Sequence, residues 1–193
     1  MARPREFDPD AVLDRAMQLF WAKGYHASSL NDLCDAMRLN RSSLYAVFGD
    51  KRTLFLKVID RYGEKEAASI FGALSRSVRF GTAVAHFFAE LVEQIVAGRG
   101  HMGCLIGNTA VEVATHDRAV AASVRRNLDR VEAAFRHALT QAKARAEIPQ
   151  HIDISAVARF FVAGTQGLRL IGKTTSDREV LEDIVKQIVR ALE

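Results

Sequence analysis

The fold of this chain is decided by residues 28–57, which read SSLNDLCDAMRLNRSSLYAVFGDKRTLFLK. Ser29 followed by Asp32 is a capping-box pattern, which predicts the start of a helix. Asn40 is a suitable N-cap for a second short helix, and Gly49 predicts where that helix ends. A tight turn separates the two. This arrangement predicts a helix-turn-helix, whose second helix can enter the major groove of DNA.

Helix signals continue on both sides of this stretch. Asp8 with Pro9 predicts the start of a first helix, and Gly24 predicts its end. Asp50 is a suitable N-cap for a fourth helix directly after Gly49. No convincing strand alternation accompanies these signals, so the segment is expected to be entirely helical.

Longer helices are predicted in the rest of the chain. Apolar residues at helical spacing begin at Phe80, and Asp117 and Asp153 are suitable N-caps for two long helices. Ser176 with Glu179 forms a capping-box pattern for the last helix. The expected fold class is all-α, with an N-terminal three-helix helix-turn-helix domain over residues 1–52 and a larger helical domain over residues 53–193.

The composition is that of a soluble globular protein. Of 193 residues, 49% are hydrophobic and 26% are charged, and the formal net charge is +4. This basic excess, with a basic arm at Arg3 and Arg5, is compatible with nucleic acid but does not require it. Cys34 and Cys104 are too few for a disulfide framework. With no apolar run of transmembrane length and no signal peptide in the sequence, we expect a cytoplasmic protein without a membrane partner.

The predicted reading helix, residues 41–48, carries side chains suited to DNA. Small polar residues and an arginine can approach base edges, and a tyrosine hydroxyl can reach a phosphate. The alternative is an ordinary helical hairpin with solvated polar residues. The expected DNA-binding residues are Arg38, Asn40, Arg41, Ser42, Ser43, Tyr45, Ala46 and Lys51.

The string LNRSSLYAVFGDKRTLF resembles the signature of TetR-family transcriptional regulators. In that family a reading helix rich in small polar residues is followed by a tyrosine, a phenylalanine and a Gly-Asp-Lys exit. The upstream string AMQLFWAKGYHASSLNDLC resembles the first two helices of the family. The strong resemblance covers about the first third of the chain.

The resemblance implies a DNA-binding repressor that binds a palindromic operator as a homodimer and is released by a small-molecule effector. It implies no enzymatic activity and no cofactor. Residues 53–193 are then the effector-binding and dimerisation domain, and the last two helices pair with their symmetry mates. Ala163, Gly164 and Gly167 form a small-residue patch that would let two helices approach closely.

One residue departs from the family pattern. The turn position that is usually glycine is Arg38 here. A positive φ at a residue other than glycine costs roughly 1 kcal/mol. Either the turn geometry differs slightly, or Arg38 offsets the strain with a phosphate contact, which is our hypothesis.

Effector contacts are expected from residues at helical spacing that combine an apolar surface with a few polar side chains. Most aromatic residues on such stripes are simple core, whereas the amides of Asn108 and Gln166 need partners and a ligand is one possibility. The candidates are Phe87, Phe88, Leu91, Cys104, Asn108, Glu112, Phe135, Leu139 and Gln166.

Three alternatives stay open from the sequence. Cys104, at a predicted helix start, is either a redox or electrophile sensor or a small buried hydrophobe, and the second reading is favoured. The pairs His86 with Glu90 and Glu112 with His116 share helix faces, so a helical metalloenzyme is conceivable, although such pairs are usually solvated neighbours. A DNA-binding protein without any effector is the third alternative.

Overall fold

The computed structural model describes residues 8–76 and 79–193, except for the side chain of Arg99. Over these residues the regular structure is entirely helical, which confirms the all-α prediction. The predicted basic arm, Arg3 and Arg5, lies outside the described residues. The elements are α1 (Pro9–Lys23), α2 (Leu30–Met37), α3 (Arg41–Phe48), α4 (Lys51–Ser75), α5 (Phe80–Gln94), a π-helical turn (Ile95–Arg99), α6 (Leu105–Glu112), α7 (Arg118–Ala144), α8 (Ile154–Ile171) and α9 (Arg178–Arg190).

The first three helices begin and end where local chemistry predicts. Asp8 caps α1 and accepts a hydrogen bond from the Asp10 amide, while Gly24 ends the helix at φ 83°. Ser29 and Asp32 form both hydrogen bonds of a capping box at α2. These caps satisfy amides that a helix end leaves without partners, so each boundary depends on residues close in sequence.

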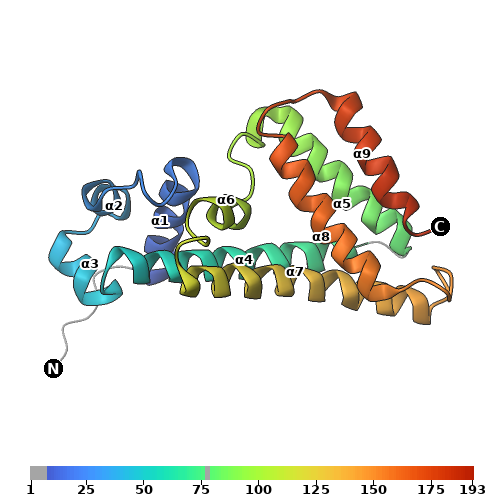
Figure 1. The fold of residues 1–193 in the computed structure, drawn as a ribbon, viewed down its shortest axis with the longest axis horizontal. Coiled ribbons are helices and arrows are strands. Elements are labelled where there is room, and N and C mark those ends of the chain that lie inside the picture. The colour runs from blue at the N-terminus through green and yellow to red at the C-terminus, as the bar shows by residue number, and fades with distance from the viewer. Residues whose placement is uncertain (1–7, 77–78) are drawn as a thin grey trace.

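Helices α4 and α7 run side by side in the same direction and form the long base of the molecule (Figure 1). An ion pair between Arg52 and Asp117 joins their first turns, and the Ser123 hydroxyl donates to Asp60 further along at 2.8 Å. Gly63 allows the closest approach, because a Cβ there would lie 1.5 Å from the side-chain oxygen of Asn127. Glycine at this position therefore sets the distance between the two helices.

Helices α5, α8 and α9 cover the second half of α4 and α7, whereas α1–α3 lie at the opposite end of the molecule (Figure 1). Fully buried aromatic rings occupy the centre of this larger part. Phe135 and Phe161 meet edge to face at 5.4 Å between ring centroids, and Phe88 contacts Phe161 at 5.9 Å. Edge-to-face pairs of this kind stabilise the core beyond their buried area.

The buried residues form two clusters that do not follow the predicted domain boundary. The cluster of α1–α3 continues into Leu54, Phe55 and Tyr62 of α4 and takes in Leu105 of α6 and Val120 of α7. The division at residues 52 and 53 thus falls at the start of a helix shared by both clusters, and it stays a prediction. The end of the molecule formed by α1–α3, which we call the reading end after its predicted role, is consequently packed directly onto the larger helical part.

Two expectations from the sequence need correction. The N-cap of α9 is Asp177, whose carboxylate accepts from the amides of Glu179 and Val180, and not Ser176 in a capping box with Glu179. The helix therefore begins one residue later, on a charged acceptor that favours the positive helix end. In addition, Phe80–Gly98 is long and apolar enough to cross a membrane by length and composition alone. In this structure Phe80 and Phe88 on that segment are buried in the core.

Candidate nucleic-acid interface and effector cavities

Helix α3 presents a polar surface from a rigid base. Leu44 and Phe48 are buried against the neighbouring helices, while Arg41, Tyr45 and Ala46 point away from the core and are exposed. Ser42 is also exposed, and Ser43 is half-buried. The predicted base-reading side of the helix is thus open to a partner.

The start of α3 is held by side chains that were expected to contact DNA. The Asn40 side-chain oxygen accepts from the Ser43 amide at 2.8 Å, so this residue caps the helix. The Arg41 guanidinium donates to Asn31 of α2 at 2.7 Å. That contact holds an exposed cation beside the first turn of the reading helix.

The turn between α2 and α3 keeps the left-handed geometry that glycine would favour. Arg38 adopts φ 55° and ψ 44°, and its amide and that of Leu39 donate to the last carbonyls of α2. Arg38 therefore carries the positive φ, and its strain, considered above from the sequence. The Arg38 side chain is exposed, and its contact with a phosphate stays a prediction.

Lys51 lies where α3 passes into α4. Its ammonium nitrogen is 4.5 Å from the centre of the Tyr25 ring, a cation–π contact. Partial burial lowers the pKa of Lys51, and the nearby carboxylate of Glu112 opposes that shift. Lys51 thus contacts the loop after α1, and its predicted phosphate contact is untested.

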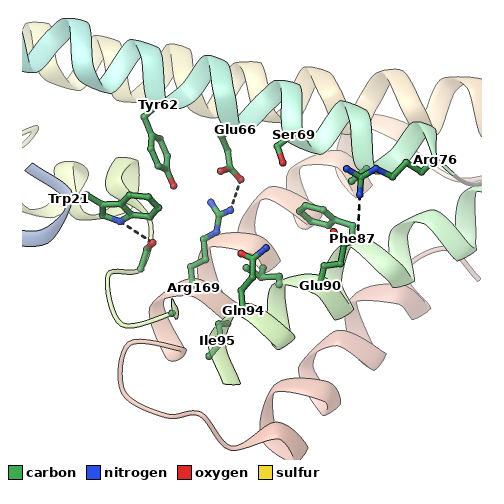
Figure 2. Close-up of a pocket in the computed structure, with 14 residues that line it drawn as sticks. Trp21, Tyr62, Glu66, Ser69, Arg76, Phe87, Glu90, Gln94, Ile95 and Arg169 are labelled. Atoms are coloured by element: carbon green, nitrogen blue, oxygen red, sulfur yellow. Dashed lines mark hydrogen bonds and ion pairs between the residues drawn. The ribbon is translucent and has the colours of Figure 1, made fainter. Parts of the chain in front are cut away.

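A cavity of about 190 Å³ lies between α4, α5 and α8, with Trp21 at one end (Figure 2). Phe87 and Leu91, two predicted effector residues, line it. Its polar centre is an ion pair between Glu66 of α4 and Arg169 of α8, with 2.5 Å between nitrogen and oxygen. The two side chains are only 16% and 15% exposed, so this pair is largely removed from water.

A second, wider cavity of about 580 Å³ lies between the end of α1, α6 and α8. It brings together four other predicted effector residues, Cys104, Asn108, Glu112 and Gln166. The Asn108 amide already has partners in the chain, since it donates to the Met102 carbonyl and accepts from a lysine. A ligand is therefore not required to satisfy it.

Three predicted effector residues lie in the core and line neither cavity. Phe88, Phe135 and Leu139 have no exposed surface. Phe88 lies on α5 beside Phe87 and Leu91, which do line a cavity, whereas Phe135 and Leu139 lie on α7, which contributes to neither cavity. Helical spacing identifies the inner face of a helix but does not separate core positions from cavity positions, because both are apolar.

Several cavity residues were not anticipated from the sequence. Trp21 comes from α1, and its indole nitrogen donates to the carbonyls of Met102 and Gly103 at 3.2 Å. Glu66 and Arg169 are 103 positions apart, and only the packing of α8 across α4 brings them into contact. The signal in the sequence was a charged residue on the apolar stripe of each helix, Glu66 on α4 and Arg169 on α8. That signal did not indicate that the two would meet.

Glu112 connects the larger part of the molecule to the reading end. Its two carboxylate oxygens accept from the backbone amides of Tyr25 and His26, at 3.0 and 2.8 Å. It lies at the end of α6 and also borders the wider cavity. Glu112 thus ties the end of α6 to the loop between α1 and α2.

Cys104 is the N-cap residue of α6 and is buried. Its sulfur lies 3.7 Å from the hydroxyl of Tyr62, which donates to it. This position agrees with the packing interpretation of Cys104, and its proposed role as a sensor stays untested.

The residues considered for metal binding lie in ordinary helix surroundings. His86 and Glu90 are exposed on α5, and Glu90 is 3.6 Å from Arg76. Over residues 8–76 and 79–193, no three histidine, cysteine or acidic side chains are grouped as a metal ion would require.

Two family profiles match the chain. Residues 12–58 match the profile described as bacterial regulatory proteins, tetR family, and residues 82–188 match the tetracyclin repressor-like C-terminal domain. The matches cover both the reading end and most of the larger helical part.

Individual relatives match over nearly the whole length. An uncharacterised HTH-type transcriptional regulator, YezE, of Bacillus subtilis is 35% identical over 96% of both chains. The HTH-type transcriptional repressor ComR of Escherichia coli is 33% identical over 97% of this chain and 90% of its own. Among solved structures, a cysteine mutant of the TetR family regulator CifR, complexed with a 26-base-pair double-strand operator DNA, is similar with a TM-score of 0.85 at 28% identity and covers all of both chains.

Proposed function

This chain belongs to the TetR family of transcriptional regulators, which are DNA-binding proteins and not enzymes, and from that membership we propose that it is a cytoplasmic repressor. In this proposal it binds a palindromic operator as a homodimer, and a small molecule releases it. The observation that carries the proposal is the exposed polar side of α3, held in place by the buried Leu44 and Phe48. The operator complex of the similar CifR mutant supports it.

The proposed dimer uses α8 and α9. Phe160 and Leu170 on α8 are 45% and 68% exposed, and Val180 at the start of α9 is 46% exposed. Exposed apolar residues on neighbouring helices are suited to a self-complementary interface. Of the predicted small-residue patch, Gly167 faces open space, whereas Gly164 packs on Ile188 of the same chain. A dimer would place two reading helices about one DNA turn, ~34 Å, apart.

The proposed release runs along α4. This helix begins at Lys51, beside α3, and reaches Glu66 at the smaller cavity without interruption. Arg61 ties the same helix to Asp10 and Asp14 of α1. A ligand that binds one position of α4 more tightly than another would change the separation of the two reading helices, by no more than that difference in affinity.

Selection of bound oligonucleotides, followed by titration of single variants, tests the proposed DNA contacts. We expect Tyr45→Phe and Lys51→Ala to weaken binding by a similar factor on all sequences, because phosphate contacts carry no base information. Arg41→Ala and Ser43→Ala should instead relax base preference at particular positions. A uniform loss in both sets would contradict this division, and recovery of no palindromic sequence would contradict the proposed operator.

A further inference from the structure

The ion pair in the smaller cavity leaves one hydrogen-bond donor without a partner. Arg169 uses its Nη2 nitrogen on the Glu66 carboxylate, while Nη1 is buried and has no hydrogen-bond partner among the described residues. A buried donor without a partner costs free energy. An acceptor that enters the cavity can form the hydrogen bond that the folded chain leaves unmade.

The remaining walls combine ring faces with a few polar side chains, among them Ser69, Gln94 and Arg76. The indole nitrogen of Trp21 is already donating to backbone carbonyls, and the Tyr62 hydroxyl donates to Cys104. Phe87 (Figure 2) adds apolar surface, and Leu91 also lines the cavity. An occupant can therefore place an apolar body against the ring faces, and it needs an accepting atom directed at Arg169.

The charges around the cavity are balanced. Glu66 faces Arg169, and Glu90 lies 3.6 Å from Arg76. A carboxylate placed here would add an uncompensated charge to a partly desolvated set, whereas a carbonyl oxygen accepts the same hydrogen bond without one. The cavity of about 190 Å³ is also smaller than sites for drug-sized ligands, which are roughly 300–1,000 Å³, so the occupant is small.

We propose that this cavity binds a small uncharged molecule with a hydrocarbon body and one carbonyl oxygen, and that this oxygen accepts a hydrogen bond from Nη1 of Arg169. That this molecule is the effector rests on the proposed function, whereas its binding depends only on the cavity.

Three ring compounds of similar size and different charge test the proposal on the full chain. Cyclohexanone is uncharged and accepts a hydrogen bond, cyclohexanecarboxylate is an anion, and cyclohexylammonium is a cation that only donates. The chain contains a single tryptophan, and Trp21 lines both this cavity and the wider one, so its indole N–H signal in a ¹⁵N–¹H spectrum reports binding at either, and variants of Arg169 assign the signal to this cavity. We expect cyclohexanone to shift that signal at concentrations roughly tenfold lower than either charged compound.

Paired variants identify the residue responsible. Arg169→Met with Glu66→Leu removes both charges together and leaves no buried unpaired ion, and it should weaken cyclohexanone binding roughly tenfold. Arg178→Met with Glu93→Gln removes a comparable but exposed ion pair between α9 and α5 and should leave binding unchanged. If the first double variant does not fold, Arg169→Lys keeps the charge but lacks the second nitrogen and should weaken binding as well.

The outcomes separate this inference from the proposed function. Tighter binding of either charged compound, no response to cyclohexanone, or equal binding by the Arg169 variants overturns the ligand class. Operator affinity, measured by fluorescence anisotropy on a selected oligonucleotide, is followed in parallel. If the chain binds no operator, the proposed function fails while the titration still decides the ligand class.

Discussion

At the scale of single residues, the most informative position is Arg38. It occupies the left-handed region at φ 55° in the turn before the reading helix, where glycine would avoid the strain. A residue that costs stability at the edge of a binding surface suggests that its side chain contributes there. The proposed contribution is a contact with a DNA phosphate.

We expect Arg38→Gly to raise the thermal midpoint and weaken operator binding. The thermal midpoint should rise because glycine relieves roughly 1 kcal/mol of backbone strain. The weaker operator binding should also depend less on salt. The slope of the logarithm of the binding constant against the logarithm of the salt concentration should fall in magnitude by about 1, because one phosphate contact disappears. Arg38→Lys, with its charge retained, is the control and should keep most of the slope. Unchanged affinity and slope in Arg38→Gly would refute the phosphate contact.

At the scale of helices, the parallel pair α4 and α7 depends on one close approach. The Asn127 side chain that meets Gly63 is itself fixed, since its nitrogen donates to the Ser123 carbonyl and its oxygen accepts from Arg130. It is also buried, with 1% of its surface exposed. Gly72 lies on the same helix, and a Cβ there would meet nothing within 4 Å.

The same substitution at these two glycines should therefore have opposite effects. Gly63→Ala should lower the free energy of unfolding by about 1–3 kcal/mol through overpacking. Gly72→Ala should raise it by up to about 1 kcal/mol, because alanine has a higher helix propensity than glycine and the added Cβ meets nothing there. Urea unfolding followed by circular dichroism measures both. Equal effects at the two positions would show that the contact with Asn127 does not determine the spacing.

Contact between α1 and α4 should make stability depend on acid pH. Hydrogen bonds from Arg61 and Lys65 hold the pKa of Asp14 at about 2, below its ordinary 3.8. A lowered carboxyl pKa stabilises the fold above the ordinary value, and that contribution is lost as the pH falls from about 4 to about 2. Asp14→Asn should reduce stability at pH 7 and show a smaller further loss over this range. Asp129→Asn, an exposed position on α7, is the matched control, and an acid response like that of the unaltered chain in Asp14→Asn would contradict the assignment.

At the scale of the whole molecule, the reading end and the cavities are connected by more than one route. Helix α4 passes from Lys51 to Glu66, and Glu112 holds the loop after α1 from the end of α6. The two clusters of buried residues share α4 and α7. A change at a cavity can therefore reach α3 through packed helices, without a flexible linker.

The proposed dimer gives the prediction at this scale. Phe160→Glu combined with Leu170→Glu should convert the chain to a monomer, because charges on an apolar interface remain unpaired. Loss of operator binding should follow, since a monomer contacts one half-site. Phe71→Glu on α4 changes a similarly exposed phenylalanine away from this surface and should leave both properties intact. Sedimentation and anisotropy measure the two effects, and a persistent dimer would exclude this interface.

Local patterns were enough to predict the helical class, the exposed side of the reading helix, and the N-caps Asp8, Ser29, Asn40, Asp50, Asp117 and Asp153. Each of these depends on hydrogen bonds and spacing within a few residues of one another. Packing alone decided that Phe88 and Phe135 are core, that Glu112 holds the loop after α1, and that Arg169 meets Glu66 at a cavity. Those partners lie far apart in the chain, and the local patterns that predict a helix contain no information about which helices cross.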